Sequence, residues 1–194
     1  MRKITLTLLL SFSMIVATGP KLVGENLNSN IRSIQEQGYK ILTFSKDDAF
    51  GIKLSPHSIQ IYFYTKKYCK EYNVPEELAF SIARLETNYR GPDMFHYNPD
   101  QTSYADAFGT YQLLLSTAKY VVEIYPESFP DITPDDITPE VLLTRVKLNT
   151  KIGIKYMRHL YGIYDSWIIA SGFYNTGYPK VNQYARDAVQ YLNV

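Results

Sequence analysis

One carboxylate in the sequence stands where a carboxylate is unexpected. Winding residues 78–89 at the helical period collects apolar side chains into a single arc, and Glu86 lies inside that arc. The apolar members are Leu78, Ala79, Ile82, Ala83, Leu85 and Tyr89, and the opposite side carries Glu77, Ser81, Arg84 and Asn88. Glu86 also falls in the last turn of this helix, where the helix dipole disfavours a negative charge. Both effects raise a carboxyl pKa, so Glu86 is a candidate general acid near neutral pH.

Periodicity alone leaves a simpler interpretation of Glu86 open. In this interpretation the helix ends at the protein surface, and Glu86 meets water or an arginine there. Further residues with matching chemistry are needed to favour catalysis over this interpretation.

A second stretch whose residue types suit a binding site is residues 103–112, Ser-Tyr-Ala-Asp-Ala-Phe-Gly-Thr-Tyr-Gln. Its small residues and Gly109 allow the backbone to come close to a ligand. The Gln112 amide offers both a hydrogen-bond donor and an acceptor. The stretch therefore predicts a polar binding loop directly ahead of the apolar run 113–115.

These blocks and a third one, taken in order, resemble the soluble lytic transglycosylase family of lysozyme-like enzymes, which cut the glycan strands of peptidoglycan. The family pattern runs Glu-Ser, then Ser-x-x-Gly-Ala-x-Gly-Leu-Met-Gln with Pro-Ser-Thr-Ala, and later Ala-Tyr-Asn-Ala-Gly. Here Glu86-Thr87 falls on the first block, and residues 173–177, Phe-Tyr-Asn-Thr-Gly, fall on the third. The second block is matched by Ser103, Ala107, Gly109 and Gln112. The resemblance covers about residues 57–194.

The resemblance implies roles for the matched residues and for two others beside them. Glu86 is implied as the catalytic acid that later acts as the base. The N-acetyl group of the muramic acid then stabilises the developing cation, and the sugar's own C6 hydroxyl closes a 1,6-anhydro ring without water. The implied binding residues are Ser103, Gln112 and Asn175 for the sugar or its N-acetyl groups, Tyr174 for orienting Glu86 or the substrate, Tyr111 for a stacking face, and Tyr184 near the C-terminal end.

For each of these binding residues, ordinary loop or core packing is the alternative to ligand contact. The chain also departs from the family pattern: Asp106 replaces a glycine, Thr110 and Tyr111 replace Leu-Met, Leu115 replaces a proline, and the segment from Glu86 to Ser103 is longer. Two other functions therefore stay open. One is a hydrolase like goose-type lysozyme, and the other is a non-catalytic glycan-binding component of an envelope-spanning machine.

The elements that must position these residues are expected to be mainly α-helical, and the resemblance implies the goose-type lysozyme or lytic transglycosylase fold. Helical signals occupy a segment from Ser55, a helix from an Asn73 cap to about Tyr89, a short helix from Ser116, a longer helix opening at Thr138, a helix capped by Asp165 and a last helix near residues 180–192. Residues 20–56 lack a sustained period and are interpreted as a lead-in segment, with a short β hairpin as an option.

The first residues predict the compartment. Arg2 and Lys3 form a basic head, and residues 4–17 form an apolar run shorter than the roughly 20 residues of a spanning helix. We interpret residues 1–17 as a signal peptide, 18–56 as the lead-in segment and 57–194 as the catalytic domain, with an uncleaved anchor as the alternative for the first segment. The protein is then expected to be exported, as a periplasmic or secreted protein of a bacterial envelope.

Composition narrows the classes of partner. With 194 residues there is room for one domain, and a formal charge of +1 gives no electrostatic reason for a nucleic-acid partner. The single cysteine, Cys69, cannot form an internal disulfide and is interpreted as a core thiol. His57, His96 and His159 show no metal-ligand spacing, so we expect no metal and no cofactor. Peptidoglycan strands are the expected partner of a monomer, with secretion or conjugation machinery as a candidate recruiter.

Overall fold

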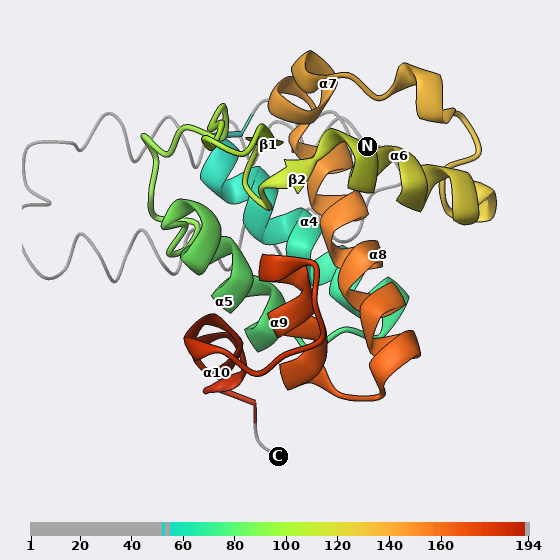
Figure 1. The fold of residues 1–194 in the computed structure, drawn as a ribbon. Coiled ribbons are helices and arrows are strands. Elements are labelled where there is room, and N and C mark those ends of the chain that lie inside the picture. Colours follow the sequence, from blue (N-terminus) through green and yellow to red (C-terminus); the bar gives the residue numbers. More distant parts are fainter. Residues whose placement is uncertain (1–51, 53–54, 193–194) are drawn as a thin grey trace, which may run out of the picture. The chain divides into compact units, whose positions relative to one another are not determined.

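The computed structural model describes residue 52 and residues 55–192 of the chain, all within one compact unit, Ala49–Val194. The expected signal peptide and the optional N-terminal hairpin lie outside the described residues. Most of the described chain is helical (Figure 1). The helices are α4 His57–Tyr72, α5 Glu76–Thr87, α6 Leu115–Ile124, α7 Pro139–Thr144, α8 Val146–Tyr164, α9 Trp167–Thr176 and α10 Gln183–Val189, with short 3-10 turns η2 Pro126–Ser128 and η3 Pro134–Asp136. The mainly α fold class predicted from the sequence is confirmed.

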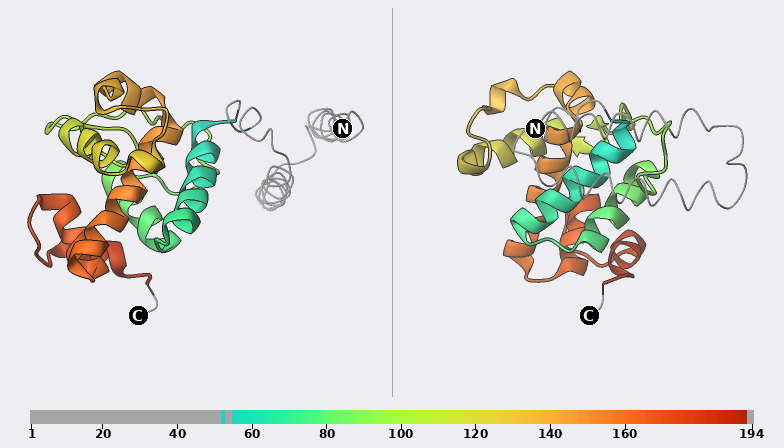
Figure 2. Two further views of the ribbon diagram at one scale, coloured as in Figure 1. Left: turned by 90° about the vertical axis from the view of Figure 1, so that its right-hand side faces the viewer. Right: turned by 180° about the vertical axis from the view of Figure 1, so that it is seen from behind.

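The long helix α8 is the centre of the packing. Its buried side chains face two neighbours, because α4 lies along one part of it and α9 along another (Figures 1 and 2). Helix α10 packs against both α9 and α5, and α5 also contacts α4. Ile61, Leu78, Ile82, Ile152 and Met157 are among the fully or almost fully buried side chains that hold these helices together. The predicted burial of Cys69 is confirmed.

Two residues predicted to cap the start of a helix, Asn73 and Asp165, instead end the helix before it. Asn73 ends α4 in the left-handed conformation, φ 54°, and its N–H bonds to the Cys69 carbonyl. Asp165 likewise ends α8 at φ 47°, while Ser166 caps α9 through a side-chain bond from the Ile169 N–H. Asparagine and aspartate suit both kinds of helix end, so their type alone does not say which end they form.

The helix predicted to open at Thr138 is two helices. Thr138 caps α7 as expected, with its side chain accepting from the Val141 N–H. The chain then leaves helical geometry at Arg145, φ −97° and ψ 75°, and restarts as α8. No proline or glycine marks this break in the sequence.

The apolar arc predicted on α5 includes one residue that is exposed and leaves out one that is buried. Leu85 is 39% exposed, and Ser81 is only 7% exposed although it was placed on the solvated side. The buried stripe of α5 is therefore turned slightly from the predicted one, because α10 and α4 cover this helix from two directions. Glu86 lies at the border of the stripe and is partly buried.

A small sheet that the sequence does not predict lies between α5 and α6. Strand β1, Ala107–Phe108, pairs antiparallel with β2, Leu113–Leu114, in the register Ala107 with Leu114 and Phe108 with Leu113. The turn between the strands contains Gly109 at φ 76° and Gln112 at φ 44°. This hairpin places the predicted binding loop next to the C-terminal end of α5.

Among the residues that the structure describes, none of the helices combines the length and the apolar character that a membrane span requires.

Candidate functional site

The site is built around the Glu86 carboxylate at the C-terminal end of α5. This helix ends at Asn88, which takes the left-handed conformation at φ 57° and donates its N–H to the Arg84 carbonyl at 2.9 Å. Glu86 therefore lies in the last turn, as predicted, where the free carbonyl groups of the helix disfavour a negative charge.

The Glu86 carboxylate has one hydrogen-bond partner among the described residues. The Tyr184 hydroxyl, from α10, donates to Glu86 Oε1 at 2.5 Å. Burial raises the pKa of Glu86 above its ordinary value, and the hydrogen bond from Tyr184 lowers it by a smaller amount. A carboxyl group in this setting retains its proton to a higher pH than an exposed glutamate. The interpretation of Glu86 as a carboxylate paired with an arginine at the surface is not supported.

Helix α10 is held in place by its own cap and by a close backbone approach. The Asn182 side chain accepts from the Ala185 N–H at 2.8 Å and starts the helix. Just before it, the Lys180 carbonyl oxygen lies so near Gly172 of α9 that a Cβ there would be 1.7 Å away. Only glycine allows this approach, which sets the position of α10 and hence of Tyr184.

Gln112 sits in the turn of the β hairpin in a strained conformation for a residue with a side chain. Its side-chain amide nitrogen donates to the carbonyls of Gly109 at 2.8 Å and Gln101 at 3.0 Å, which stabilises the positive φ. Both donors are used internally, so the acceptor Oε1 is the group that Gln112 can offer to a ligand. Strain of this kind clusters at functional sites.

A hydrogen-bond cluster that the sequence analysis missed ties this loop to α5. The Thr87 hydroxyl lies 3.0 Å from the carbonyl of Ala83 and 3.0 Å from that of Thr110. The buried Tyr97 hydroxyl donates to Thr87 Oγ1 at 2.6 Å. Thr87 follows Glu86 directly in the matched block, and that adjacency was the one available signal. The longer segment between Glu86 and Ser103 thus contributes Tyr97 to the support of the site.

Asn149 of α8 anchors the same loop from the other side. Its Nδ2 donates to the Phe108 carbonyl at 2.9 Å, and its Oδ1 accepts from the Tyr111 N–H at 3.2 Å. Gly109, at φ 76°, makes room for it, because a Cβ at this position would lie 2.4 Å from the Asn149 amide nitrogen. The loop is therefore fixed to two helices by buried polar side chains.

Tyr174 and Tyr111 are joined by a hydrogen bond. The Tyr174 hydroxyl donates to the Tyr111 carbonyl at 2.7 Å. Burial raises the Tyr174 pKa, and the Glu86 charge raises it further. Tyr111 is fully buried, with its hydroxyl 2.8 Å from Thr65 Oγ1. A ring with no exposed face cannot stack on a sugar, so the stacking role predicted for Tyr111 is wrong.

Ser103 and Asn175 are not in hydrogen-bond contact with Glu86. Ser103 Oγ accepts from the N–H groups of Ala105 and Ala107, each at 3.2 Å, and so shapes the turn that carries Asp106 at φ 52°. Asn175 is exposed at the end of α9 and accepts from the Asn182 side chain at 3.0 Å. Ser103 lies in the loop before β1 and Asn175 in the last turn of α9. Their contacts with a sugar stay predictions.

A cavity of about 420 Å³ lies beside Tyr174, between α6, α8 and α9. Its lining includes Tyr120, which is 45% exposed, and also Tyr156 and His159. The Tyr156 ring contacts the Tyr174 ring with centroids 5.5 Å apart, so Tyr174 packs directly behind the lining of this cavity. Burial and the neighbouring Lys155 lower the His159 pKa, so this histidine is neutral at pH 7. These three ring residues were not among the predicted site residues.

Within the described part of the chain, no group of three or more histidine, cysteine, aspartate or glutamate side chains is arranged to hold a metal ion. The chemistry that the site can perform with its own residues is proton transfer by Glu86, with hydrogen bonding from Tyr184 and Gln112.

Comparison with known proteins identifies the family of the chain. Residues 63–191 match the family described as Transglycosylase SLT domain. Two solved structures are similar, each 26% identical: the 70-kDa soluble lytic transglycosylase in complex with bulgecin A, with a TM-score of 0.49, and the 70-kDa soluble lytic transglycosylase from Escherichia coli, with a TM-score of 0.48. Each match covers 65% of this chain and 18% of the other. Among curated proteins, none matches the chain.

Proposed function

The chain belongs to the Transglycosylase SLT domain family, and we propose that it is a peptidoglycan lytic transglycosylase with Glu86 as its single catalytic acid and base. The observation that carries the proposal is the setting of Glu86. Its carboxyl group is partly buried, its pKa is raised, and its Oε1 accepts a hydrogen bond from the Tyr184 hydroxyl at 2.5 Å. The adjacent loop is fixed by Thr87 and Asn149.

In the first step, protonated Glu86 donates its proton to the oxygen that joins N-acetylmuramic acid to N-acetylglucosamine. The bond between this oxygen and C1 of the muramic acid breaks, and the carbonyl oxygen of the N-acetyl group stabilises the positive charge at C1. The raised pKa supports this step because it keeps the acid protonated towards neutral pH. Tyr184 supports it by fixing the orientation of the carboxyl group.

In the second step, the ionised Glu86 takes the proton of the sugar's C6 hydroxyl. The C6 oxygen forms a bond with C1, which closes the 1,6-anhydro ring and restores the protonated glutamate. One carboxylate suffices for both steps, whereas common retaining and inverting glycosidases need two. Asp106 is the other carboxylate within the matched blocks, but it stands where the family pattern has a glycine. No position of the family pattern therefore supplies a second carboxylate, which supports the single-residue mechanism.

The neighbouring residues are assigned to substrate binding and to support. Gln112 would accept a hydrogen bond from the sugar through Oε1, and Ser103 and Asn175 would contact its polar groups at the rim. Tyr174 would act by holding the Tyr111 carbonyl, and thereby the turn before Gln112. The cavity lined by Tyr120 and Tyr156 would bind sugar rings of the same strand, since aromatic faces suit the apolar faces of sugars.

Since peptidoglycan lies outside the cytoplasmic membrane, the proposal includes export to the bacterial envelope, with residues 1–17 as the signal peptide and 57–194 as the catalytic domain. Action as a monomer and recruitment by a secretion or conjugation machine stay predictions.

The first test is cleavage of isolated peptidoglycan, followed as loss of turbidity. We expect Glu86→Gln to lower the rate by about 10² or more, because glutamine has no proton to donate. Glu77→Gln, on the exposed side of the same helix, is the matched control and should keep the wild-type rate. If the wild type binds peptidoglycan without clearing it, the chain is a glycan-binding component instead.

A further inference from the structure

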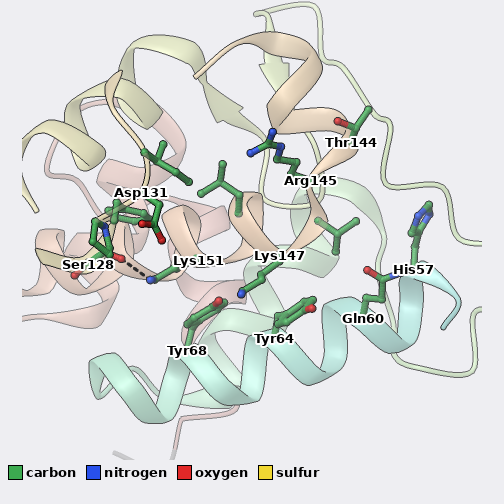
Figure 3. A pocket seen from close by; sticks show the side chains of 15 residues that line it. His57, Gln60, Tyr64, Tyr68, Ser128, Asp131, Thr144, Arg145, Lys147 and Lys151 are labelled. Atoms are coloured by element: carbon green, nitrogen blue, oxygen red, sulfur yellow. Dashed lines mark hydrogen bonds between the residues drawn. The ribbon is translucent and has the colours of Figure 1, made fainter. Parts of the chain in front are cut away.

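A second cavity, of about 560 Å³, lies between α4, the segment 128–132 and the start of α8 (Figure 3). We refer to it as the α4–α8 cavity. Glu86, Tyr174 and Tyr184 do not line it, and neither do the residues of the Gln112 loop. Its volume falls in the range of small-molecule sites.

The lining of the α4–α8 cavity is positively charged. Arg145, Lys147 and Lys151 contribute cations, and Asp131 contributes the one carboxylate of the lining. Arg145 and Lys151 alone outnumber that carboxylate. The ion pairs of the described residues, Lys66 with Glu76 and Lys155 with Glu127, do not include Arg145, Lys151 or Asp131. In Figure 3, Lys147 extends towards the tyrosines of α4, Lys151 extends towards Ser128, and Arg145 lies farther from the tyrosines.

Lys151 is held in a partly dehydrated position. Its Nζ donates to the Ser128 carbonyl and lies 5.0 Å from the centroid of the Phe129 ring and 5.6 Å from that of Tyr68. Burial lowers the Lys151 pKa, the Glu71 carboxylate raises it in part, and the neighbouring lysines at 147, 67 and 155 lower it further. An anion in the cavity would favour the charged form of this lysine and reduce the repulsion between the lysines.

Two tyrosine hydroxyls of the lining have no hydrogen-bond partner among the described residues. Tyr64 is 3% exposed and Tyr68 is 2% exposed, and both line the cavity from α4. Buried tyrosine hydroxyls are usually hydrogen-bonded, as those of Tyr89, Tyr97 and Tyr111 are in this chain. The hydroxyls of Tyr64 and Tyr68 are not fully enclosed, unlike the unpartnered hydroxyl of Tyr72. They are therefore available donors on the α4 side of the cavity, which His57 and Gln60 also line.

The start of α8 adds further donors to the same cavity. Residues 145–148 line it, and this helix has neither a side-chain cap nor an acidic residue in its first turn. Cations at the positive end of a 19-residue helix are unfavourable unless an anion is present to compensate. The cations, the phenol groups and the helix end thus all favour an anionic ligand.

We propose that the α4–α8 cavity is a second binding site, separate from Glu86, for an anionic group, a carboxylate or a phosphate, carried by a ligand whose apolar part packs on the rings of Tyr64 and Phe129.

Calorimetric titration of the full chain tests this with three probes: inorganic phosphate, N-acetylalanine and the uncharged N-acetylalaninamide. We expect saturable binding of at least one anion with a Kd of about 1 mM, and no binding of the amide. Arg145→Gln and Lys151→Gln should each weaken the binding about tenfold or more, because each removes a charge-assisted hydrogen bond. Lys70→Gln, an exposed lysine of α4 outside the cavity, should leave it unchanged.

The probes also identify the source of the anion. Binding of phosphate alone assigns a phosphate ligand, binding of N-acetylalanine alone assigns a carboxylate, and binding of both assigns any ligand with either group. Glu86→Gln should bind the anions like the wild type, so the result is independent of lytic activity. The proposal is overturned if neither anion binds saturably, if the amide binds as tightly as the acid, or if both cavity variants, shown to be folded by circular dichroism, bind like the wild type.

Discussion

At the scale of single residues, the Glu86–Tyr184 pair governs the proposed chemistry. Burial raises the pKa of Glu86, and the Tyr184 hydroxyl opposes this by stabilising the ionised form. A residue that must be acid in one step and base in the next needs both influences, because too strong a preference for either form slows one of the two steps. Tyr184 is therefore a positioning residue whose hydroxyl also adjusts the acid.

Tyr184→Phe should move the alkaline limb of the pH–rate profile to higher pH. Loss of the hydrogen bond removes the one influence that lowers the Glu86 pKa, so the glutamate stays protonated to a higher pH than in the wild type. The maximal rate should fall about tenfold because the ionised carboxylate loses its donor. Tyr191→Phe, a change at an exposed tyrosine just beyond α10, is the control. A limb that does not move would show that Tyr184 only supports the fold.

Several site residues could be predicted from the sequence, but the contacts between them could not. The position of Glu86 followed from helical periodicity, whereas its partner depended on α10 crossing α5 98 residues later in the chain. Tyr111 was misassigned because the matched block says which position it occupies but not that its ring turns towards Thr65. The support from Thr87, Tyr97 and Asn149 was missed because buried polar bridges between distant segments leave no local pattern.

At the scale of elements, the site depends on how closely α10 approaches α9. The segment between them passes directly over Gly172, and Tyr184 follows on the first turn of α10.

Helix existence was predicted well because apolar periodicity is local, but the break at Arg145 and the β hairpin at 107–114 arise from tertiary contacts. The Asn149 bonds to the hairpin are one such contact.

Gly172→Ala should separate Tyr184 from Glu86. The new methyl group would lie 1.7 Å from the Lys180 carbonyl oxygen, so the backbone before α10 must move. We expect a loss of about 2 kcal/mol in the free energy of unfolding, together with a loss of lytic activity. Chemical denaturation and turbidity assays measure the two effects.

The matched control is Gly162→Ala in α8, where a Cβ meets no atom within 4 Å. This change should keep the activity and raise the stability by up to about 1 kcal/mol, because alanine favours the helix. If Gly172→Ala behaves like Gly162→Ala, the close approach does not determine the position of α10.

At the scale of the whole molecule, Glu86 lowers the stability of the fold in the pH range where it is ionised. The folded protein raises the Glu86 pKa, so the folded state binds this proton more tightly than the unfolded state does. The corresponding stabilisation is complete below the unfolded pKa and is lost as the pH rises through the folded pKa. Stability and activity thus make opposite demands on this one side chain.

Glu86→Gln should therefore be more stable than the wild type at pH 8, and the difference should disappear as the pH falls towards 4. Glutamine carries no charge and incurs no penalty for burial of a carboxylate. Thermal unfolding of both proteins across this pH range measures the effect. A difference that is constant with pH, or that grows in acid, would contradict a raised Glu86 pKa.

The central claim, that Glu86 catalyses ring closure without water, is tested most directly by mass spectrometry of the muropeptides released from purified peptidoglycan. We predict fragments ending in 1,6-anhydromuramic acid, one water lighter than hydrolysis products, from the wild type and not from Glu86→Gln. Reducing-end fragments from the wild type would identify a hydrolase like goose-type lysozyme. Anhydro fragments released equally by Glu86→Gln would show that another residue is the acid.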